Sequence, residues 1–282
     1  MIINEFMYDP LTGQNEWIEF FNRSNETIDL AGWRFSDRPT TGGSVNTFIM
    51  TAQSHTIRPG DFVVAAAEST IFSRFPLLRA PASTRHLFIL NRSGGLSFGN
   101  DGDAIILRDQ SGLAIDTVSY SPNWHHPDVT DSKGRSLERI NQEIGSNDRR
   151  NWSTSAAFSG GTPGERNSLH TTGLSSNASL SFNPNPFSPD GDGFEDFCII
   201  RYNLPLTTSL IRITIFDRRG RNVKTLANSE LAGPTGEVIW DGLDTQKQRV
   251  RIGPYIVFLE AIDGQGGIVA AAKGVVVVAT KL

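Results

Sequence analysis

Turn-forming residues recur at short intervals along this chain, and each group of them precedes a short run rich in apolar side chains. Arg58-Pro59-Gly60-Asp61 leads into residues 62–66, and Asp109-Gln110-Ser111-Gly112 leads into residues 113–120. Residues 16–21 alternate with a period of two, as the side chains of a β-strand do. Short strands joined by tight turns build sandwiches and barrels. The sequence therefore predicts an all-β fold.

A change of composition divides the chain into two parts. Residues 168–180 are rich in Ser, Thr, Asn, Gly and His, a composition that is typical of linkers. A chain of 282 residues has room for two domains of ordinary size. We therefore predict two β-sandwiches in tandem, residues 1–167 and residues 181–282, joined by a linker.

Composition and charge argue against several classes of protein. Apolar residues make up 38% of the chain, and no run approaches the roughly 20 apolar residues of a membrane-spanning helix. The net charge is −4, and residues 181–282 are neutral, with 11 basic and 11 acidic side chains. Nucleic-acid binders carry a basic excess, so no nucleic-acid partner is expected. Arg218-Arg219-Gly220-Arg221 is basic, but it falls in a predicted hairpin loop and is interpreted as a solvated turn.

The single cysteine and the first residues bear on the cellular compartment. Cys198 has no cysteine partner, so no intrachain disulfide can form, and its apolar surroundings predict a small buried side chain. Residues 1–5 lack the charged region and apolar run of a signal peptide. Since the chain begins abruptly in what looks like a strand, we expect a fragment of a longer protein.

Short motifs follow one another in a characteristic order across residues 1–167. They are Ile3-Asn4-Glu5, Glu16-Trp17-Ile18-Glu19, Asp29-Leu30-Ala31-Gly32-Trp33, Ile57-Arg58-Pro59-Gly60, Gly102-Asp103-Ala104-Ile105, Ser136-Leu137-Glu138-Arg139, Asn151-Trp152-Ser153 and Gly161-Thr162-Pro163-Gly164 followed by Asn167. In this order they resemble the lamin tail domain, an immunoglobulin-like sandwich of nuclear lamins that also occurs in bacterial secreted proteins. The resemblance implies an interaction module without activity of its own. Trp17, Trp33 and Trp152 are expected to be its large core side chains.

A second set of motifs covers residues 181–282. It comprises Asn185-Pro186-Phe187-Ser188-Pro189-Asp190-Gly191-Asp192-Gly193, Arg201-Tyr202-Asn203-Leu204-Pro205, Trp240-Asp241-Gly242 and Gly253-Pro254-Tyr255. These motifs resemble the FlgD-like immunoglobulin domain and the C-terminal sorting domains of type IX secretion cargo in the Bacteroidetes group. The first resemblance implies only a structural sandwich, and the second implies passage across the outer membrane. Both are immunoglobulin-like sandwiches, so the fold cannot decide between them.

Three aspartates after the Asn185 motif form the clearest candidate for a bound ion. Asp190, Asp192 and Asp196 are spaced like the first part of a calcium loop, and the glycines between them allow a sharp turn. The distal glutamate of a twelve-residue EF-hand loop does not follow. Two interpretations therefore stay open, a calcium site or a turn whose carboxylates lie in water.

Other candidate sites carry weaker signals. His125 and His126, with Asp128 and Asp131, have the chemistry of zinc ligands, but adjacent histidines in a strand would point to opposite faces. Asn100-Asp101-Gly102-Asp103 is interpreted as a plain turn. Glu16 and Glu19 are expected on opposite faces of one strand, which argues against joint acid–base chemistry. No Gly-x-Ser-x-Gly, His-Glu-x-x-His or Walker motif occurs.

The hypothesis that follows is a non-catalytic interaction or structural region of an exported bacterial protein, secreted or held at the cell surface. Its second domain would act as a secretion and attachment signal through the secretion machinery, and exposed loops of the first would meet a protein or cell-surface partner. One alternative is a metal-dependent hydrolase using Asp190, Asp192 and Asp196 or His125 and His126, or an accessory part of a secreted hydrolase. Another is a lamin-like filament or nucleic-acid-associated module, which the charge count disfavours.

Overall fold

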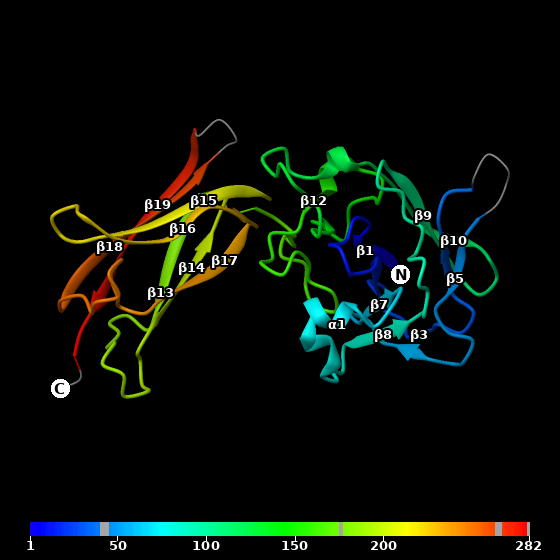
Figure 1. Ribbon diagram of the computed structural model, residues 1–282, viewed down its shortest axis with the longest axis horizontal. Helices are drawn as coiled ribbons and strands as arrows, with labels where there is room; N and C mark the ends of the chain where they lie inside the picture. Colours follow the sequence, from blue (N-terminus) through cyan, green and yellow to red (C-terminus); the bar gives the residue numbers. More distant parts are fainter. Residues whose placement is uncertain (40–44, 175–176, 263–266, 281–282) are drawn as a thin grey trace. The chain divides into compact units, whose positions relative to one another are not determined.

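The computed structural model describes residues 1–39, 45–174, 177–262 and 267–280. The chain divides into two compact units, Met1–Thr172 and Gly173–Leu282, and each is described by itself. Strands form nearly all of the regular structure, which confirms the all-β prediction (Figure 1). In the described part of the chain no helix has the length and apolar character needed to span a membrane.

The first unit is built from two main sheets. Its strands are β1 (Ile2–Met7), β2 (Trp17–Phe21), β3 (Ile28–Asp29), β4 (Arg34–Ser36), β5 (Thr47–Ile49), β6 (Thr56–Ile57), β7 (Phe62–Ala66), β8 (Arg85–Ile89), β9 (Asp103–Arg108), β10 (Ala114–Tyr120), β11 (Leu137–Arg139) and β12 (Trp152–Thr154). One sheet has the order β12-β11-β1-β2-β7-β8, and the other has the order β10-β9-β4-β5. Strands β3 and β6 pair with each other, and β7 and β8 run parallel, unlike the other pairs. In the described part of this unit, short helical segments join the strands: α1 (Ile71–Arg74), η1 (Pro76–Arg79), η2 (Pro122–Trp124) and η3 (Arg149–Asn151).

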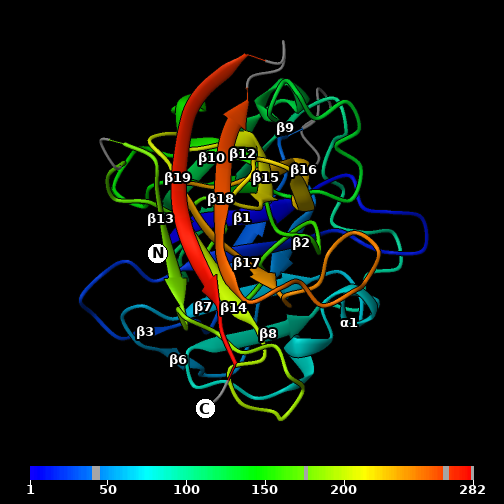
Figure 2. The ribbon, with the colours of Figure 1, turned by 90° about the vertical axis from the view of Figure 1, so that its left-hand side faces the viewer.

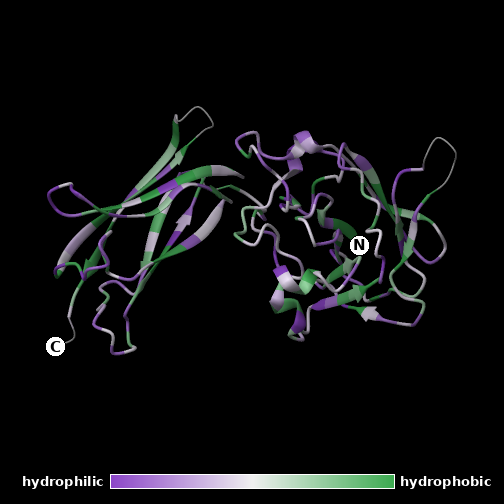
Figure 3. Cartoon of the chain, viewed as in Figure 1, coloured by the Kyte–Doolittle hydropathy of each residue, from purple (hydrophilic) through white to green (hydrophobic). Residues whose placement is uncertain are grey.

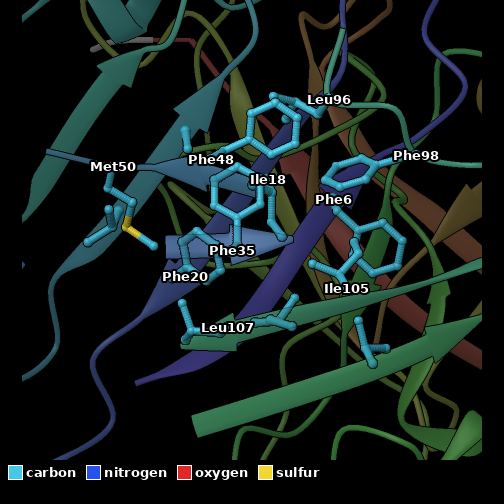
Figure 4. Packing of buried hydrophobic residues seen from close by; sticks show 14 of the residues in the cluster. Phe6, Ile18, Phe20, Phe35, Phe48, Met50, Leu96, Phe98, Ile105 and Leu107 are labelled. Carbon is cyan, nitrogen blue, oxygen red and sulfur yellow. The ribbon is translucent and has the colours of Figure 1, made fainter. Parts of the chain in front are cut away.

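The main core of this unit combines side chains from both sheets (Figure 4). Phe35 of β4 is fully buried, with its ring centroid 5.6 Å from that of Phe20 and 5.2 Å from that of Phe48. Burying a side chain of this size contributes about 1.5–3 kcal/mol to folding. The predicted core positions Trp33 and Trp152 are buried in the same cluster.

The six-stranded sheet is covered on its other face as well. Trp17 is buried there against Phe75, which follows α1, with ring centroids 5.6 Å apart. In β1 the pairing register shifts between Ile3 and Glu5, so the usual alternation of faces is interrupted. Every residue of β1 is buried as a result of packing on both faces.

The segment predicted as a linker, residues 168–180, is partly built into both units. Leu169 is fully buried, and its backbone N–H donates to Glu138 at 3.0 Å. Strand β13 already begins at Ser179. The polar residues at the start of the segment therefore serve as hydrogen-bond donors inside the first unit, which composition alone does not distinguish from a solvated linker.

The second unit is also made of two sheets. Its strands are β13 (Ser179–Asn183), β14 (Cys198–Asn203), β15 (Ser209–Phe216), β16 (Asn222–Ala232), β17 (Thr235–Trp240), β18 (Gly253–Ile262) and β19 (Ile268–Val278). The sheets have the orders β13-β14-β17 and β16-β15-β18-β19, and the long strands β18 and β19 lie side by side (Figure 2). Apolar residues concentrate in the strands, and the loops are mostly hydrophilic (Figure 3).

The core of the second unit is centred on Trp240, which is fully buried. Its ring lies 5.3 Å from that of Phe187 and 5.2 Å from that of Tyr255, measured between centroids. Cys198 is fully buried in the same cluster, and burial raises the pKa of its thiol to about 11. The prediction of a buried Cys198 is therefore confirmed.

Candidate functional site

Three glutamates lie next to one another across three adjacent strands of the first unit. The register pairs Glu5 of β1 directly with Glu19 of β2 and with Glu138 of β11. All three side chains are fully buried. Carboxylates in direct cross-strand pairs repel one another when they are charged. Clustered carboxyl groups can also act as general acids and bases in catalysis. The hydrogen-bond partners of the three glutamates therefore decide whether they are structural or available for chemistry.

Residues 160–169, here called the closing segment, supply donors to the first of these carboxyl groups. The backbone N–H of Thr162 donates to Glu5 Oε1 at 2.8 Å, and its hydroxyl donates to Oε2 at 2.9 Å. The hydroxyl of Ser136 donates to the same Oε1 at 2.5 Å. Both oxygens of Glu5 are therefore occupied by groups of the protein itself.

The other two glutamates are held in the same way. Glu19 accepts from the backbone N–H of Gly164 at 2.5 Å and from the side-chain amide of Asn4 at 2.8 Å. Glu138 accepts from the hydroxyl of Ser168 at 2.9 Å and from the backbone N–H of Leu169 at 3.0 Å. Buried polar groups that are paired in this way stabilise one arrangement of the chain.

Two glycines explain why the closing segment can approach so closely. A side chain at Gly161 would come within 2.8 Å of the Trp17 ring and 3.0 Å of Glu5 Oε1. Gly164 has a φ of +80°, a left-handed conformation that glycine adopts without strain, and a Cβ there would overlap Arg85. The Gly161-Thr162-Pro163-Gly164 motif is thus the piece of chain that fits over the carboxyl groups.

Burial changes the ionisation of the cluster. It raises the pKa of Glu5 well above its ordinary value, and the neighbouring charges of Glu138 and Glu19 raise it further. Burial also raises the pKa of Glu138, and it raises that of Glu19 to about 8 against the opposing hydrogen bonds. The cluster therefore shares protons at neutral pH and titrates as a unit. Because the three carboxyl groups are fully buried and hydrogen-bonded within the protein, they are suited to holding the closing segment against the sheet.

The sequence alone does not predict this cluster. Glu19 lies in one motif with Glu16, while Glu138 and Thr162 lie in two other motifs, and no local pattern links the three. One sequence pattern could have pointed to it. Thr162, Asn167 and Ser168 carry hydrogen-bonding side chains beside small residues, as a segment that donates to buried acceptors would. Asn167 donates to the backbone carbonyls of Asn4 and Arg139, which fastens the segment further.

Glu16 has a separate role from Glu19. It precedes β2 and accepts hydrogen bonds from the backbone N–H groups of Leu96 and Phe98, the latter at 3.1 Å. Burial raises its pKa to about 7, against the effect of these hydrogen bonds. The two carboxyl groups serve different parts of the unit, so they do not form an acid–base pair.

The three aspartates singled out in the sequence do come together in the second unit. Oxygen atoms of Asp190, Asp192 and Asp196 all lie within 4.8 Å of one another, and among the described residues this is the one such group with metal-ligand chemistry. Asp196 accepts from the backbone N–H groups of Gly191 and Gly193, at 2.5 and 2.8 Å. Each carboxylate can accept several bonds, so these turn contacts leave capacity for a cation. The donor set fits the all-oxygen preference of calcium.

The four residues considered as zinc ligands, His125, His126, Asp128 and Asp131, do not converge on one point. His125 follows a 3₁₀ turn rather than lying in a strand, and it is buried with Nδ1 2.9 Å from the hydroxyl of Thr154. Burial lowers its pKa to about 4. His126 lies 3.6 Å from Asp128, whereas Asp131 accepts the backbone N–H of Lys133. At the other candidate turn, Asp103 accepts backbone N–H groups, as a plain turn requires.

Several solved structures are distantly similar to this chain. The crystal structure of dimeric latent PorU from Porphyromonas gingivalis is 12% identical, with a TM-score of 0.31, over 99% of this chain and 20% of that chain. PorZ, described as a bacterial surface component of the type-IX secretion system of the same organism, is 10% identical, with a TM-score of 0.29, over 98% of this chain and 38% of that one. The Amycolatopsis orientalis exo-chitosanase CsxA is 12% identical, with a TM-score of 0.22, over 96% of this chain and 26% of that one. TM-scores this low do not establish a shared fold.

The chain spans less than two fifths of the length of each of these three proteins. No curated protein matches it. A family model described as the Lamin Tail Domain matches residues 1–122, a stretch that ends before β11, β12 and the closing segment. Residues 1–122 are therefore similar to the lamin tail family, whose model covers 122 of the 282 residues of this chain.

Proposed function

We propose that this chain is a non-catalytic structural and interaction region of an exported protein. The observation that carries the proposal is the cluster of Glu5, Glu19 and Glu138. These three carboxyl groups are buried and hydrogen-bonded to the closing segment. Groups held in this way support the fold and are not available to a substrate.

The test is a search for turnover with a built-in control. The purified chain and its Glu19→Gln variant are incubated with chromogenic esters, phosphate esters, glycosides and peptides. We expect neither protein to release product faster than buffer. Turnover by the original chain that disappears in a folded Glu19→Gln variant would contradict the non-catalytic role.

The second unit is proposed to act in export or surface attachment. The support is its resemblance to FlgD-like and type IX sorting domains, together with the way its characteristic motif is anchored. Phe187 donates its backbone N–H to Val277 at 3.0 Å and accepts from Ala279 at 2.9 Å. The side chain of Asn185 bonds to the backbone of Val275 and Val277. The motif and the last strand thus form one structural element.

Export is tested with a reporter protein fused to residues 173–282 in a bacterium that has a type IX secretion system. We expect the reporter at the cell surface or in the medium, and we expect a fusion lacking residues 275–282 to stay inside. A reporter retained in the periplasm by a folded fusion would leave the second unit as a structural module only.

A second proposal concerns calcium at Asp190, Asp192 and Asp196. The favouring observation is the convergence of three carboxylates within 4.8 Å on an exposed turn, since like charges at that distance are relieved by a cation. A ligand present at 100 times its Kd stabilises the folded state by about 2.7 kcal/mol.

Thermal unfolding in EDTA and then in millimolar calcium tests the calcium proposal. We expect calcium to raise the Tm of the original chain and of the Asp101→Ala control, whose aspartate lies in an exposed turn of the first unit. The rise should vanish in Asp192→Ala. Equal Tm values with and without calcium would overturn the proposal.

A further inference from the structure

Two turns of the second unit line a pocket of about 900 Å³. One turn is residues 217–221, between β15 and β16, and the other is residues 244–248, after β17. The backbone N–H of Thr245 donates to the carbonyl of Val223 at 3.1 Å, which joins the two turns. The volume lies in the range of small-ligand sites. Because a backbone hydrogen bond holds its two walls together, the pocket is formed before any ligand binds.

The two turns have the same internal construction. Asp217 accepts backbone N–H groups two and four residues later, at 2.8 and 3.0 Å, and Asp244 does the same at 2.8 and 2.9 Å. Gly220 and Lys247, each three residues after its aspartate, have positive φ values of 76° and 61°. The two carboxylates of the pocket wall are therefore used to shape the turns.

Five arginines line the same pocket as these two aspartates. Arg218, Arg219, Arg221, Arg249 and Arg251 all line the pocket and are exposed. Arg221 pairs with Asp217 at 2.7 Å. The other four have no ion pair within the part of the chain that the structure describes. The pocket therefore presents an excess of guanidinium groups, although the whole unit is neutral in sequence.

We propose that this pocket binds an acidic saccharide. Guanidinium groups form paired hydrogen bonds with carboxylate, sulfate and phosphate groups. The amide side chains of Gln246 and Gln248 suit sugar hydroxyls, and Ile252, 66% exposed at the rim, suits the apolar face of a sugar ring. The proposal names the ligand class for the interaction role proposed above and rests on it.

The remaining wall favours a saccharide over a nucleic acid. Proteins that hold single-stranded nucleic acids stack the bases on exposed aromatic rings. Tyr255, the aromatic residue of this wall, is only 7% exposed, and its hydroxyl donates to the carbonyl of Arg251 at 2.7 Å. The ring thus positions an arginine-bearing segment and offers no stacking face.

The test is isothermal titration of the full chain with a heparin-derived hexasaccharide and with a galacturonic acid hexamer. Maltohexaose serves as the uncharged probe, and a single-stranded DNA 12-mer serves as the nucleic-acid probe. The variant is Arg249→Gln with Arg251→Gln. The matched control is Arg201→Gln with Arg212→Gln, which removes two exposed arginines of the same unit outside the pocket. Thermal unfolding confirms that both variants fold.

We expect at least one acidic hexasaccharide to bind and the pocket variant to weaken binding at least tenfold, with the control changing Kd less than twofold. The sulfated and carboxylated probes tell which acidic group is preferred. Equal weakening in variant and control, binding of maltohexaose as tight as that of the acidic probes, DNA binding as tight as saccharide binding, or no binding would overturn the proposal. The length of the recovered saccharide is measured too: shortening would contradict the non-catalytic role, whatever the Kd shows.

Discussion

Thr162 donates two hydrogen bonds to Glu5, one from its backbone and one from its hydroxyl, across 157 positions of the sequence. The same hydroxyl lies 3.2 Å from Glu138 Oε1. One residue of the closing segment therefore touches two of the three carboxyl groups, Glu5 of β1 and Glu138 of β11. An acceptor buried without its donor costs about 1–3 kcal/mol, so this contact should matter for stability.

Replacing Thr162 by valine keeps its shape and removes its hydroxyl. We expect Thr162→Val to lower the free energy of unfolding of the first unit by about 1–3 kcal/mol, because buried acceptors lose a partner. Urea denaturation measures the change. Thr56→Val, at an exposed position of β6, should change stability by no more than about 0.5 kcal/mol. Equal stabilities of Thr162→Val and the original chain would show that the bond contributes nothing.

The raised pKa of Glu19 predicts a stability that falls with rising pH. Its pKa is about 8 in the folded state and near the ordinary glutamate value of 4.5 when unfolded, so the folded state binds the proton more tightly. The contribution is complete below pH 4.5 and is lost as pH rises to about 8. Above pH 7 Glu16 has largely ionised, because its folded pKa is about 7. The loss there should therefore report on the buried cluster.

Glu19→Gln should flatten this dependence, since the amide does not titrate. The free energy of unfolding is measured by urea denaturation at intervals from pH 4.5 to 8.5. Glu143→Gln provides the comparison, because Glu143 is an exposed carboxyl group of the first unit outside the closing segment. Parallel pH profiles for the two variants would argue against the raised pKa of Glu19.

His125 predicts a loss of stability in acid. Burial lowers its folded pKa from 6.5 to about 4, so the unfolded state takes up the proton more readily. Its contribution is present above pH 6.5 and is lost as pH falls to about 4, by an amount of order 3 kcal/mol. His125→Gln should reduce the fall between these pH values. Urea denaturation measures the free energy of unfolding at both pH values. If the imidazole were accessible to water, the variant and the original chain would lose the same stability between them.

The structure predicts that residues 1–122, the stretch matched by the family model, do not fold alone. Without β11 and β12 the strand β1 loses a neighbour, and Glu5 and Glu19 lose their closing partners. We expect residues 1–172 to unfold cooperatively and residues 1–122 to show no cooperative transition by near-UV circular dichroism. A shared transition at the same temperature would show that the closing segment is dispensable.

Local features of the fold could be predicted from the sequence. Ile211, Ile213 and Ile215 alternate along residues 210–216, and all three are buried in β15 as that pattern predicts. On the opposite face Arg212 is exposed as the pattern predicts, whereas Thr214 is buried. Strand period and turn chemistry act between residues a few positions apart, so a single sequence carries them. The grouping of Asp190, Asp192 and Asp196 was predictable for the same reason.

Features that depend on distant residues could not be predicted in this way. Glu5 meets Glu138 only through the register of β1 with β11, and a shift of one residue would turn it to the other face. His125 was expected in a strand, but it follows a helical turn and is enclosed by packing. Arg219 lies in one turn and Arg249 directly follows the other, and the aspartates of these turns, Asp217 and Asp244, are 27 positions apart in the sequence. The two arginines line one pocket only because a backbone hydrogen bond joins the two turns. No local pattern specifies these meetings.

Hydrogen exchange of the closing segment tests most directly whether the buried carboxyl groups are structural. Mass spectrometry with fragmentation follows the backbone amides of Thr162, Gly164 and Leu169, each of which donates to a glutamate. We expect these amides to exchange as slowly as those of β1 and β2, because they open only when the first unit unfolds. Exchange as fast as in the exposed turn at Asp101 would contradict this account, since the segment would then open over the carboxyl groups as a lid opens over an active site.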